Sequence, residues 1–171
     1  MAVYYRFSTE GGDHESLGKQ RDILGYGLPE QNFRPGWEKT GFDHPDEVQT
    51  LLAPFTTHHF FIYGITELKS PVDKGHLHLR PYSRSGFLQD LEDCNGVICG
   101  AGFELAGEAL QLGKKLLVKP LKGQFEQLSN ALALEKLQLA RVMQRLDRKA
   151  VQLWLELPPN ALAGYPRIRR S

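Results

Sequence analysis

Two glycines that follow an apolar run are the residues whose spacing best suggests chemistry. In the segment GVICGAGFELAGEALQLGKKLLVKP, Gly100 and Gly102 flank Ala101 directly after residues 96–99. Glycines there let the backbone approach a ligand closely, and a helix expected from Phe103 onward offers free N–H groups and a positive dipole end to an anion. The pattern fits a cradle for a diphosphate. It also fits an ordinary tight turn, because two spaced glycines alone have low specificity.

Two carboxylates stand in that expected helix. Glu104 and Glu108 are four residues apart and so share a helix face. In one interpretation Glu104 complements the positive helix end and Glu108 is simply solvated. In the other, Glu108 accepts hydrogen bonds from two adjacent hydroxyls of a ribose, because its two oxygens match a diol.

A third polar group opens the segment PLKGQFEQLSNALALEKL. Residues 124–137 predict a helix whose beginning carries three polar side chains: Glu126, Gln127 and Asn130. The apolar positions are expected to form its buried stripe: Phe125, Leu128 and Leu132. Carboxylate and amide groups suit the hydroxyls of a sugar, and they also suit plain helix capping.

The elements that must position these residues alternate along the chain. Apolar runs predict strands over residues 59–63, 75–81, 96–99 and 115–119, and amphipathic patterns predict helices over residues 45–55, 83–91, 103–112, 124–137 and 149–157. We expect Asp43 to cap the first helix, and Ser83 or Ser85 to cap the second. The alternation predicts an α/β fold, a Rossmann-like parallel sheet with helices on both faces. Ligands of such sheets bind at the carboxyl ends of the strands.

The first part of the chain has a different composition. Residues 1–41 hold many glycines and charges, with a short strand expected over residues 3–7 and one helix over residues 17–24. We therefore predict an atypical N-terminal segment over residues 1–41, a domain over residues 42–157 and a basic tail over residues 158–171.

Composition narrows the class of protein. The chain has 171 residues, 41% of them hydrophobic and 24% charged, as in a globular protein with its own core. A formal net charge of +1 gives no reason to expect a nucleic-acid partner. No signal-peptide pattern opens the chain, and no apolar run approaches the ~20 residues of a spanning helix. We expect a cytoplasmic protein.

The sequence gives weaker evidence for a metal site or a membrane contact than for the glycine turn. Cys94 and Cys99 form neither a metal signature nor a disulfide framework. His76 and His78 would share one strand face, but spacing supplies no third ligand, so we expect a solvated face, no metal and no cofactor. We read His58 and His59 as strand-edge residues. The basic tail either touches anionic lipid as a peripheral contact or solubilises the chain end.

The combined motifs carry a family resemblance. Residues 42–147, with GAGFELAGEALQLGKKLLVKP followed by EQLSNA, resemble the C-terminal, nucleotide-sugar donor domain of bacterial and archaeal glycosyltransferases of the GT-B architecture. They are more distantly similar to the peptidoglycan N-acetylglucosaminyltransferase and to plant and animal UDP-glycosyltransferases. The resemblance implies half of a GT-B fold, a UDP-sugar as the ligand and a glycosyltransferase of the hexosyltransferase type.

The resemblance also implies residue roles around the glycine turn. Gly100, Ala101, Gly102 and Phe103 would face the diphosphate of the UDP-sugar. Glu108 would hold the ribose.

Further roles follow from the flanking motifs. Glu126 and Gln127 would contact the donor sugar, and Asn130 completes the closing motif Gln127-x-x-Asn130. Tyr82 would lie near the base, through its backbone. Glu104 stands where related enzymes have a small polar residue.

Two departures from the family limit the implied activity. GT-B enzymes carry an N-terminal acceptor domain that supplies the catalytic base, and about forty residues cannot build one. The place of the domain's opening strand holds PGWEKT, a poor strand. The resemblance therefore implies a donor-binding half that needs an acceptor-domain protein as partner.

Two alternatives remain open. The chain could be a non-catalytic nucleotide-sugar-binding remnant. The start YYRFSTEGGDHESLGKQRDIL faintly resembles a serine recombinase, with Arg6 and Ser8 at its arginine–serine pair. That resemblance would imply a DNA strand-exchange fragment.

Overall fold

A seven-stranded sheet organises the molecule. The computed structural model describes residues 2–5, 44–65, 68–81 and 83–158. The strands are β1 (Ala2–Tyr5), β2 (Phe60–Tyr63), β3 (Val72–Lys74), β4 (Leu77–Leu79), β5 (Gly96–Cys99), β6 (Lys115–Val118) and β7 (Arg141–Val142), in the order β3-β4-β2-β1-β5-β6-β7. The β3–β4 pair is antiparallel, and every other neighbouring pair is parallel.

The first strand occupies the centre of this sheet. β1 pairs with β2 in the register Ala2↔Phe60 and with β5 in the register Ala2↔Gly96. Without β3, the sequence β4-β2-β1-β5-β6-β7 is the order 3-2-1-4-5-6 of a Rossmann sheet. The predicted fold class is confirmed. β1, which comes from residues 1–41, thus serves as the opening strand of the domain, the role for which PGWEKT was unsuited. The division of the chain at residue 42 stays a prediction.

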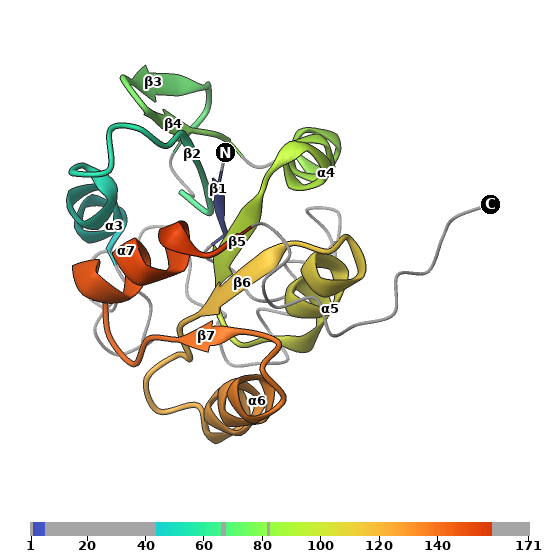
Figure 1. Ribbon diagram of the computed structural model, residues 1–171. Coiled ribbons are helices and arrows are strands. Elements are labelled where there is room, and N and C mark those ends of the chain that lie inside the picture. Colours follow the sequence, from blue (N-terminus) through green and yellow to red (C-terminus); the bar gives the residue numbers. More distant parts are fainter. Residues whose placement is uncertain (1, 6–43, 66–67, 82, 159–171) are drawn as a thin grey trace.

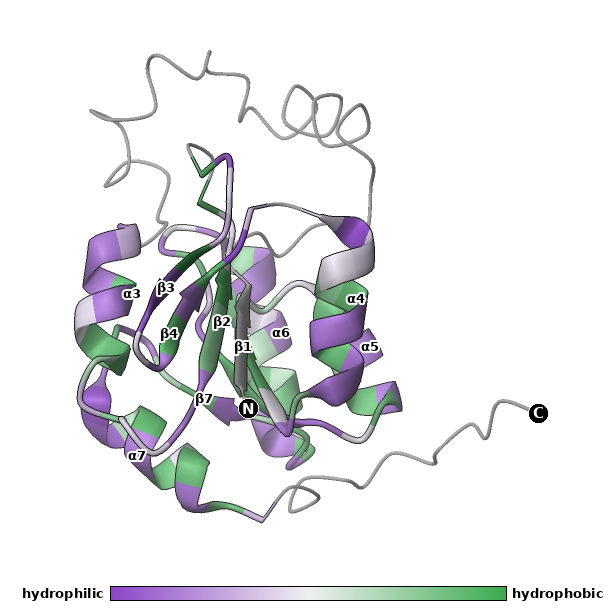
Figure 2. Ribbon diagram, turned by 90° about the horizontal axis from the view of Figure 1, so that it is seen from above, coloured by the Kyte–Doolittle hydropathy of each residue, from purple (hydrophilic) through white to green (hydrophobic). Residues whose placement is uncertain are grey.

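Helices cover both faces of the sheet. Figures 1 and 2 show α3 (Pro45–Leu52) and α7 (Arg148–Glu156) on one side, and α4 (Arg84–Asp93), α5 (Phe103–Gln111) and α6 (Phe125–Lys136) on the other. The α3/α7 face buries side chains that include Leu52, Phe60 and Trp154. The α4/α5/α6 face buries side chains that include Leu91 and Leu105. No helix in the described part of the chain is long and apolar enough to cross a membrane.

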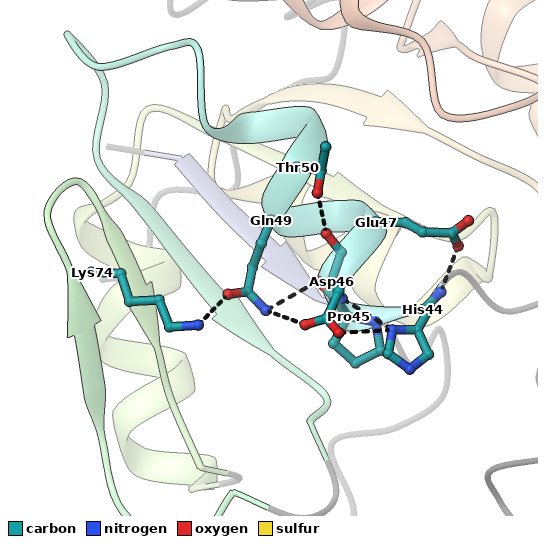
Figure 3. Close-up of polar contacts among 7 residues, drawn as sticks. All are labelled: His44, Pro45, Asp46, Glu47, Gln49, Thr50 and Lys74. Atoms are coloured by element: carbon teal, nitrogen blue, oxygen red, sulfur yellow. Dashed lines mark hydrogen bonds and ion pairs between the residues drawn. The ribbon is translucent and has the colours of Figure 1, made fainter.

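The start of α3 corrects one expectation (Figure 3). The predicted cap Asp43 is wrong, because His44 is the N-cap residue. Its Nδ1 accepts a hydrogen bond from the Asp46 N–H at 3.2 Å, and the Glu47 carboxylate accepts one from the His44 N–H at 3.0 Å. Proline is favoured at the first helical position, so Pro45 fixes the cap one residue later than we predicted.

The predicted elements otherwise match closely. Ser83 caps α4 by accepting the Gly86 N–H at 3.2 Å, which confirms one of its two candidate caps. Sequence reasoning missed β3 and β7. All three residues of β3 are exposed and β7 is two residues long, so neither carries the apolar run that marks a buried strand.

Candidate functional site

The loop after β5 is held from both sides by α6. Ala101 is fully buried, and its N–H donates to Gln127 Oε1 at 3.1 Å. The Asn130 amide nitrogen donates to the Ala101 carbonyl at 3.0 Å. Both polar groups of one residue are therefore fixed by side chains 26 and 29 positions away.

The same amide also fixes the loop after β6. Gln127 Oε1 accepts the Leu121 N–H at 3.1 Å, so one oxygen joins the two loops at the carboxyl ends of β5 and β6. Gln127 and Asn130 are 6% and 7% exposed. Burial of amide groups is unfavourable unless they are hydrogen-bonded, and here the bonds go to backbone. We call Gln127, Asn130 and the Ala101 peptide groups they hold the amide clamp.

The helix that starts beside the clamp leaves its N-terminus open. Gly102 is the N-cap of α5, with φ −74° and ψ 147°, and no side chain caps the helix. The described glycines with positive φ lie elsewhere: Gly64, Gly75, Gly113 and Gly123. Gly102 therefore does not adopt the left-handed backbone that favours glycine. Uncapped N–H groups at the positive end of a helix bind anions.

The three predicted carboxylates lie on the two helices that follow these loops. Glu104 and Glu108 are exposed on α5, and Glu126 is exposed in the first turn of α6. Phe103, the first residue of α5, is 65% exposed. The structure thus brings Ala101, within the predicted glycine turn, together with Gln127 and Asn130. Tyr82 lies outside the described residues, as do Arg6 and Ser8 of the recombinase resemblance.

The predicted buried stripe of α6 is wrong. Phe125, Leu128 and Leu132 are 83%, 37% and 51% exposed, while the buried positions are Gln127, Asn130, Ala131 and Leu134. These four follow the spacing i, i+3, i+4, i+7, which is an equally regular helix face. The polar clamp residues share it with Ala131 and Leu134, so the helix turns its larger apolar side chains outward. The missed signal was the run Gln127-x-x-Asn130-Ala131-x-x-Leu134.

Burial raises the pKa of three further side chains: Tyr63, Cys94 and Cys99. The Tyr63 hydroxyl at the end of β2 donates to Asp90 Oδ2 at 2.5 Å, and burial together with this bond raises the pKa of Tyr63. Burial raises the pKa of the Cys99 thiol to about 12 and also raises that of Cys94. These groups stay protonated at neutral pH and are unsuited to act as bases or nucleophiles.

Comparison with known proteins decides the family. Residues 41–159 match the model of glycosyl transferase family 1. The chain belongs to this family. The glycosyltransferase resemblance is thereby confirmed at the level of the family. No protein with a curated description matches the chain.

One solved structure agrees on the fold, and a second match is weaker. The crystal structure of the glycotransferase of kitacinnamycin is 15% identical, with a TM-score of 0.50, and the match covers 95% of this chain and 32% of that one. The glycosyltransferase SnogD from Streptomyces nogalater is 17% identical, with a TM-score of 0.43, and the match covers 95% of this chain and 41% of that one. The family member described here thus spans about a third of the length of the first of these glycosyltransferases.

Proposed function

We propose that this family 1 chain binds a UDP-sugar at the carboxyl ends of β5 and β6, as the donor half of a glycosyltransferase. The observation that carries the proposal is the amide clamp. Two buried side chains fix the Ala101 peptide groups immediately before an uncapped helix N-terminus. A preorganised set of N–H groups recognises a diphosphate without further ordering.

The charges around the clamp favour a nucleotide sugar over a bare phosphate. The α5 N-terminus offers hydrogen-bond donors, which need an anionic acceptor. Glu108 and Glu126 are exposed carboxylates that can accept hydrogen bonds from a ligand. A nucleoside diphosphate sugar carries both kinds of group, because its phosphates accept and its ribose and sugar hydroxyls donate.

Each site residue has a proposed task. Gly100 to Phe103 lie along the diphosphate, Glu108 holds the ribose diol, and Glu126 contacts the sugar. Gln127 and Asn130 hold the turn in shape, with Gln127 at the sugar side. Tyr82 lies near the base through its backbone.

Transfer itself requires a partner in this proposal. The chain spans 32% and 41% of the two compared glycosyltransferases. We propose that an acceptor-binding protein completes the enzyme and supplies the base. Purified chain mixed with a UDP-sugar and sugar or lipid acceptors should therefore give no glycoside product. A product formed by the chain alone would contradict this part.

The ribose contact is tested with Glu108→Gln. An ionised carboxylate that accepts two hydroxyl bonds is worth about 1.5–3 kcal/mol, and the amide loses the charge and one acceptor. UDP affinity should fall about tenfold or more by calorimetry, since ~1.4 kcal/mol is one decade. Glu135→Gln, an exposed carboxylate near the other end of α6, is the matched control and should bind as wild type. Equal affinity in Glu108→Gln and wild type would remove the support for the ribose assignment.

A further inference from the structure

Two histidines face each other on neighbouring strands, away from the clamp. His59 directly precedes β2, and His78 is the middle residue of β4, opposite Phe61 in the parallel register. His59 Nδ1 and His78 Nε2 are 2.8 Å apart, and the planes of the two rings differ by 17°. His76 does not join them, because its Nε2 lies 3.2 Å from the Leu52 carbonyl of α3. His76 and His78, which we expected on one strand face, therefore do not contribute to one metal site.

The other nitrogen of His78 is held by a carboxylate. His78 Nδ1 lies 2.8 Å from Asp73 Oδ1 on β3, and Arg80 Nη1 donates to the same oxygen at 2.8 Å. The Arg80 guanidinium favours the ionised form of the Asp73 carboxylate. The carboxylate therefore accepts a hydrogen bond from the N–H at His78 Nδ1. The lone pair of His78 is then on Nε2, which points at His59.

Packing fixes the His78 ring in this orientation. Phe61 stacks on His78 at 4.7 Å between ring centres, and the Arg80 guanidinium lies 5.2 Å from the centre of the Phe61 ring. The His78 side chain is 16% exposed, whereas that of Asp73 is 61% exposed. His59 is exposed, so one of the two rings is accessible to solvent.

We propose that His59 and His78 form a two-histidine binding site for a divalent transition-metal ion of the zinc class, with water completing the coordination. The two imidazole nitrogens form a hydrogen bond while one neutral ring carries a hydrogen between them, and a metal ion can take that place when His59 carries its hydrogen on Nε2 instead. Imidazole is a preferred ligand of zinc, and metal-bound histidines characteristically donate their other N–H to a carboxylate, as His78 does to Asp73.

Metal binding requires a slightly longer nitrogen–nitrogen distance and a turn of the His59 ring. Zn–N bonds of about 2.0–2.1 Å in a tetrahedral arrangement separate two nitrogens by about 3.3 Å, roughly half an ångström more than the hydrogen-bonded pair. His59 stands before the first residue of β2 and is exposed, so it supplies the movement. No group of three or more metal-binding side chains occurs among the described residues, so water must fill the remaining positions. The site joins β2 to the β3–β4 hairpin.

Zinc titration of the tag-free, chelator-treated full chain tests the site. Zinc chloride is added in a calorimeter, and cobalt(II) is added separately to record its visible absorption. The variants are His59→Asn, His78→Asn and Asp73→Asn. His58→Asn is the matched control, because His58 is the next residue and contacts Thr57 at 3.1 Å instead of the pair.

The expected result is one zinc ion per chain in wild type and in His58→Asn. Asp73→Asn should weaken zinc binding about 10–100-fold, and removal of either ligand histidine should weaken it further. Equal zinc affinity in wild type, His59→Asn and His78→Asn would overturn the proposal, as would a comparable loss in His58→Asn. If a ligand variant does not fold, the wild-type cobalt spectrum decides, and absence of bands for nitrogen coordination overturns the site. A UDP titration of the same samples keeps this result separate from the proposed function.

Discussion

Two regions of the molecule bury polar side chains that bind backbone groups. They differ in the helix end beside them, which is the N-terminus of α5 in one and the C-terminus of α7 in the other. At the carboxyl ends of β5 and β6, Gln127 and Asn130 hold the loop around Ala101. At the start of β6, Lys115 is 7% exposed, and its Nζ donates to the carbonyls of Leu155 and Leu157 at 2.8 and 2.9 Å.

In the lysine region, the buried side chain binds backbone acceptors at the end of a helix. The Lys115 amine lies 5.0 Å from the centre of the Trp154 ring, and it satisfies carbonyls at the end of α7. The amide clamp instead borders the uncapped N-terminus of α5. We therefore propose a binding site beside the clamp, where helix N–H groups have no side-chain cap, and none beside Lys115. Variants in the two regions should separate stability from ligand binding.

The largest effect is expected for Gln127→Met. Loss of the amide leaves the N–H groups of Ala101 and Leu121 buried without their acceptor, at about 1–3 kcal/mol each. Urea unfolding should show this loss, and UDP affinity should fall by about tenfold or more because the turn is no longer fixed. Gln152→Met, on the exposed side of α7, is the control and should change neither quantity much. Unchanged UDP affinity in a folded Gln127→Met would break the link between clamp and site.

Gly96→Ala should lower the stability of the protein by disturbing the region of Lys115 and Trp154, and should leave the amide clamp unchanged. A Cβ at position 96 would lie 2.6 Å from both Lys115 Cγ and Trp154 Cζ2, closer than real contacts allow. Forced repacking of this kind costs about 1–3 kcal/mol. Urea unfolding measures the loss, and UDP affinity should stay within about twofold of wild type. Gly107→Ala is the matched control, because a Cβ there meets nothing within 4 Å. Equal stability of the two variants would contradict the packing described for Lys115 and Trp154.

A smaller effect is expected for Lys115→Met. The carbonyls of Leu155 and Leu157 lose a charged donor, and relief of the buried charge offsets part of that loss. We expect a net destabilisation of about 1–2 kcal/mol in urea unfolding, with UDP binding unchanged. A tenfold loss of UDP affinity in this variant would show that the two regions are coupled.

The smallest effect concerns pH. Burial lowers the pKa of Lys115 below its ordinary value of 10.5. Between the lowered pKa and 10.5 the unfolded chain binds more protons than the folded chain, so the free energy of unfolding rises with pH in that window. Wild type should therefore gain stability relative to Lys115→Met as the pH rises toward 10.5. A constant difference between the two across that range would contradict a charged, desolvated amine.

The sequence predicted elements well where apolar runs meet glycine or proline. The strand expected over residues 96–99 and the helix expected from Phe103 match β5 and α5, because Gly100, Gly102 and Gly113 set their ends. The same reasoning failed for α6, since two helix faces were periodic and size alone favoured Phe125 over Ala131. Only the contact of Gln127 and Asn130 with a loop 26 or more residues earlier decides between the faces.

Contacts between residues far apart in the sequence also explain why the strand order and the histidine pair could not be predicted. The sequence of residues 2–5 does not predict that β1 lies between β2 and β5, because the pairing depends on partner strands more than 50 residues away. Likewise, His59 and His78 meet across two strands, and a spacing of 19 residues matches no local motif. The types of the candidate site residues were readable from the sequence, whereas their division into clamp residues and exposed carboxylates required the fold.

The central claim is that the clamped turn before α5 binds the diphosphate of a nucleotide sugar. A calorimetric titration of the full chain with UDP, with UMP and ADP run alongside, tests it most directly. The account predicts saturable heat for UDP, weaker binding of UMP because the second phosphate is missing, and weaker binding of ADP because its base differs. Absence of heat with UDP at millimolar concentration, in protein that unfolds cooperatively, would contradict it.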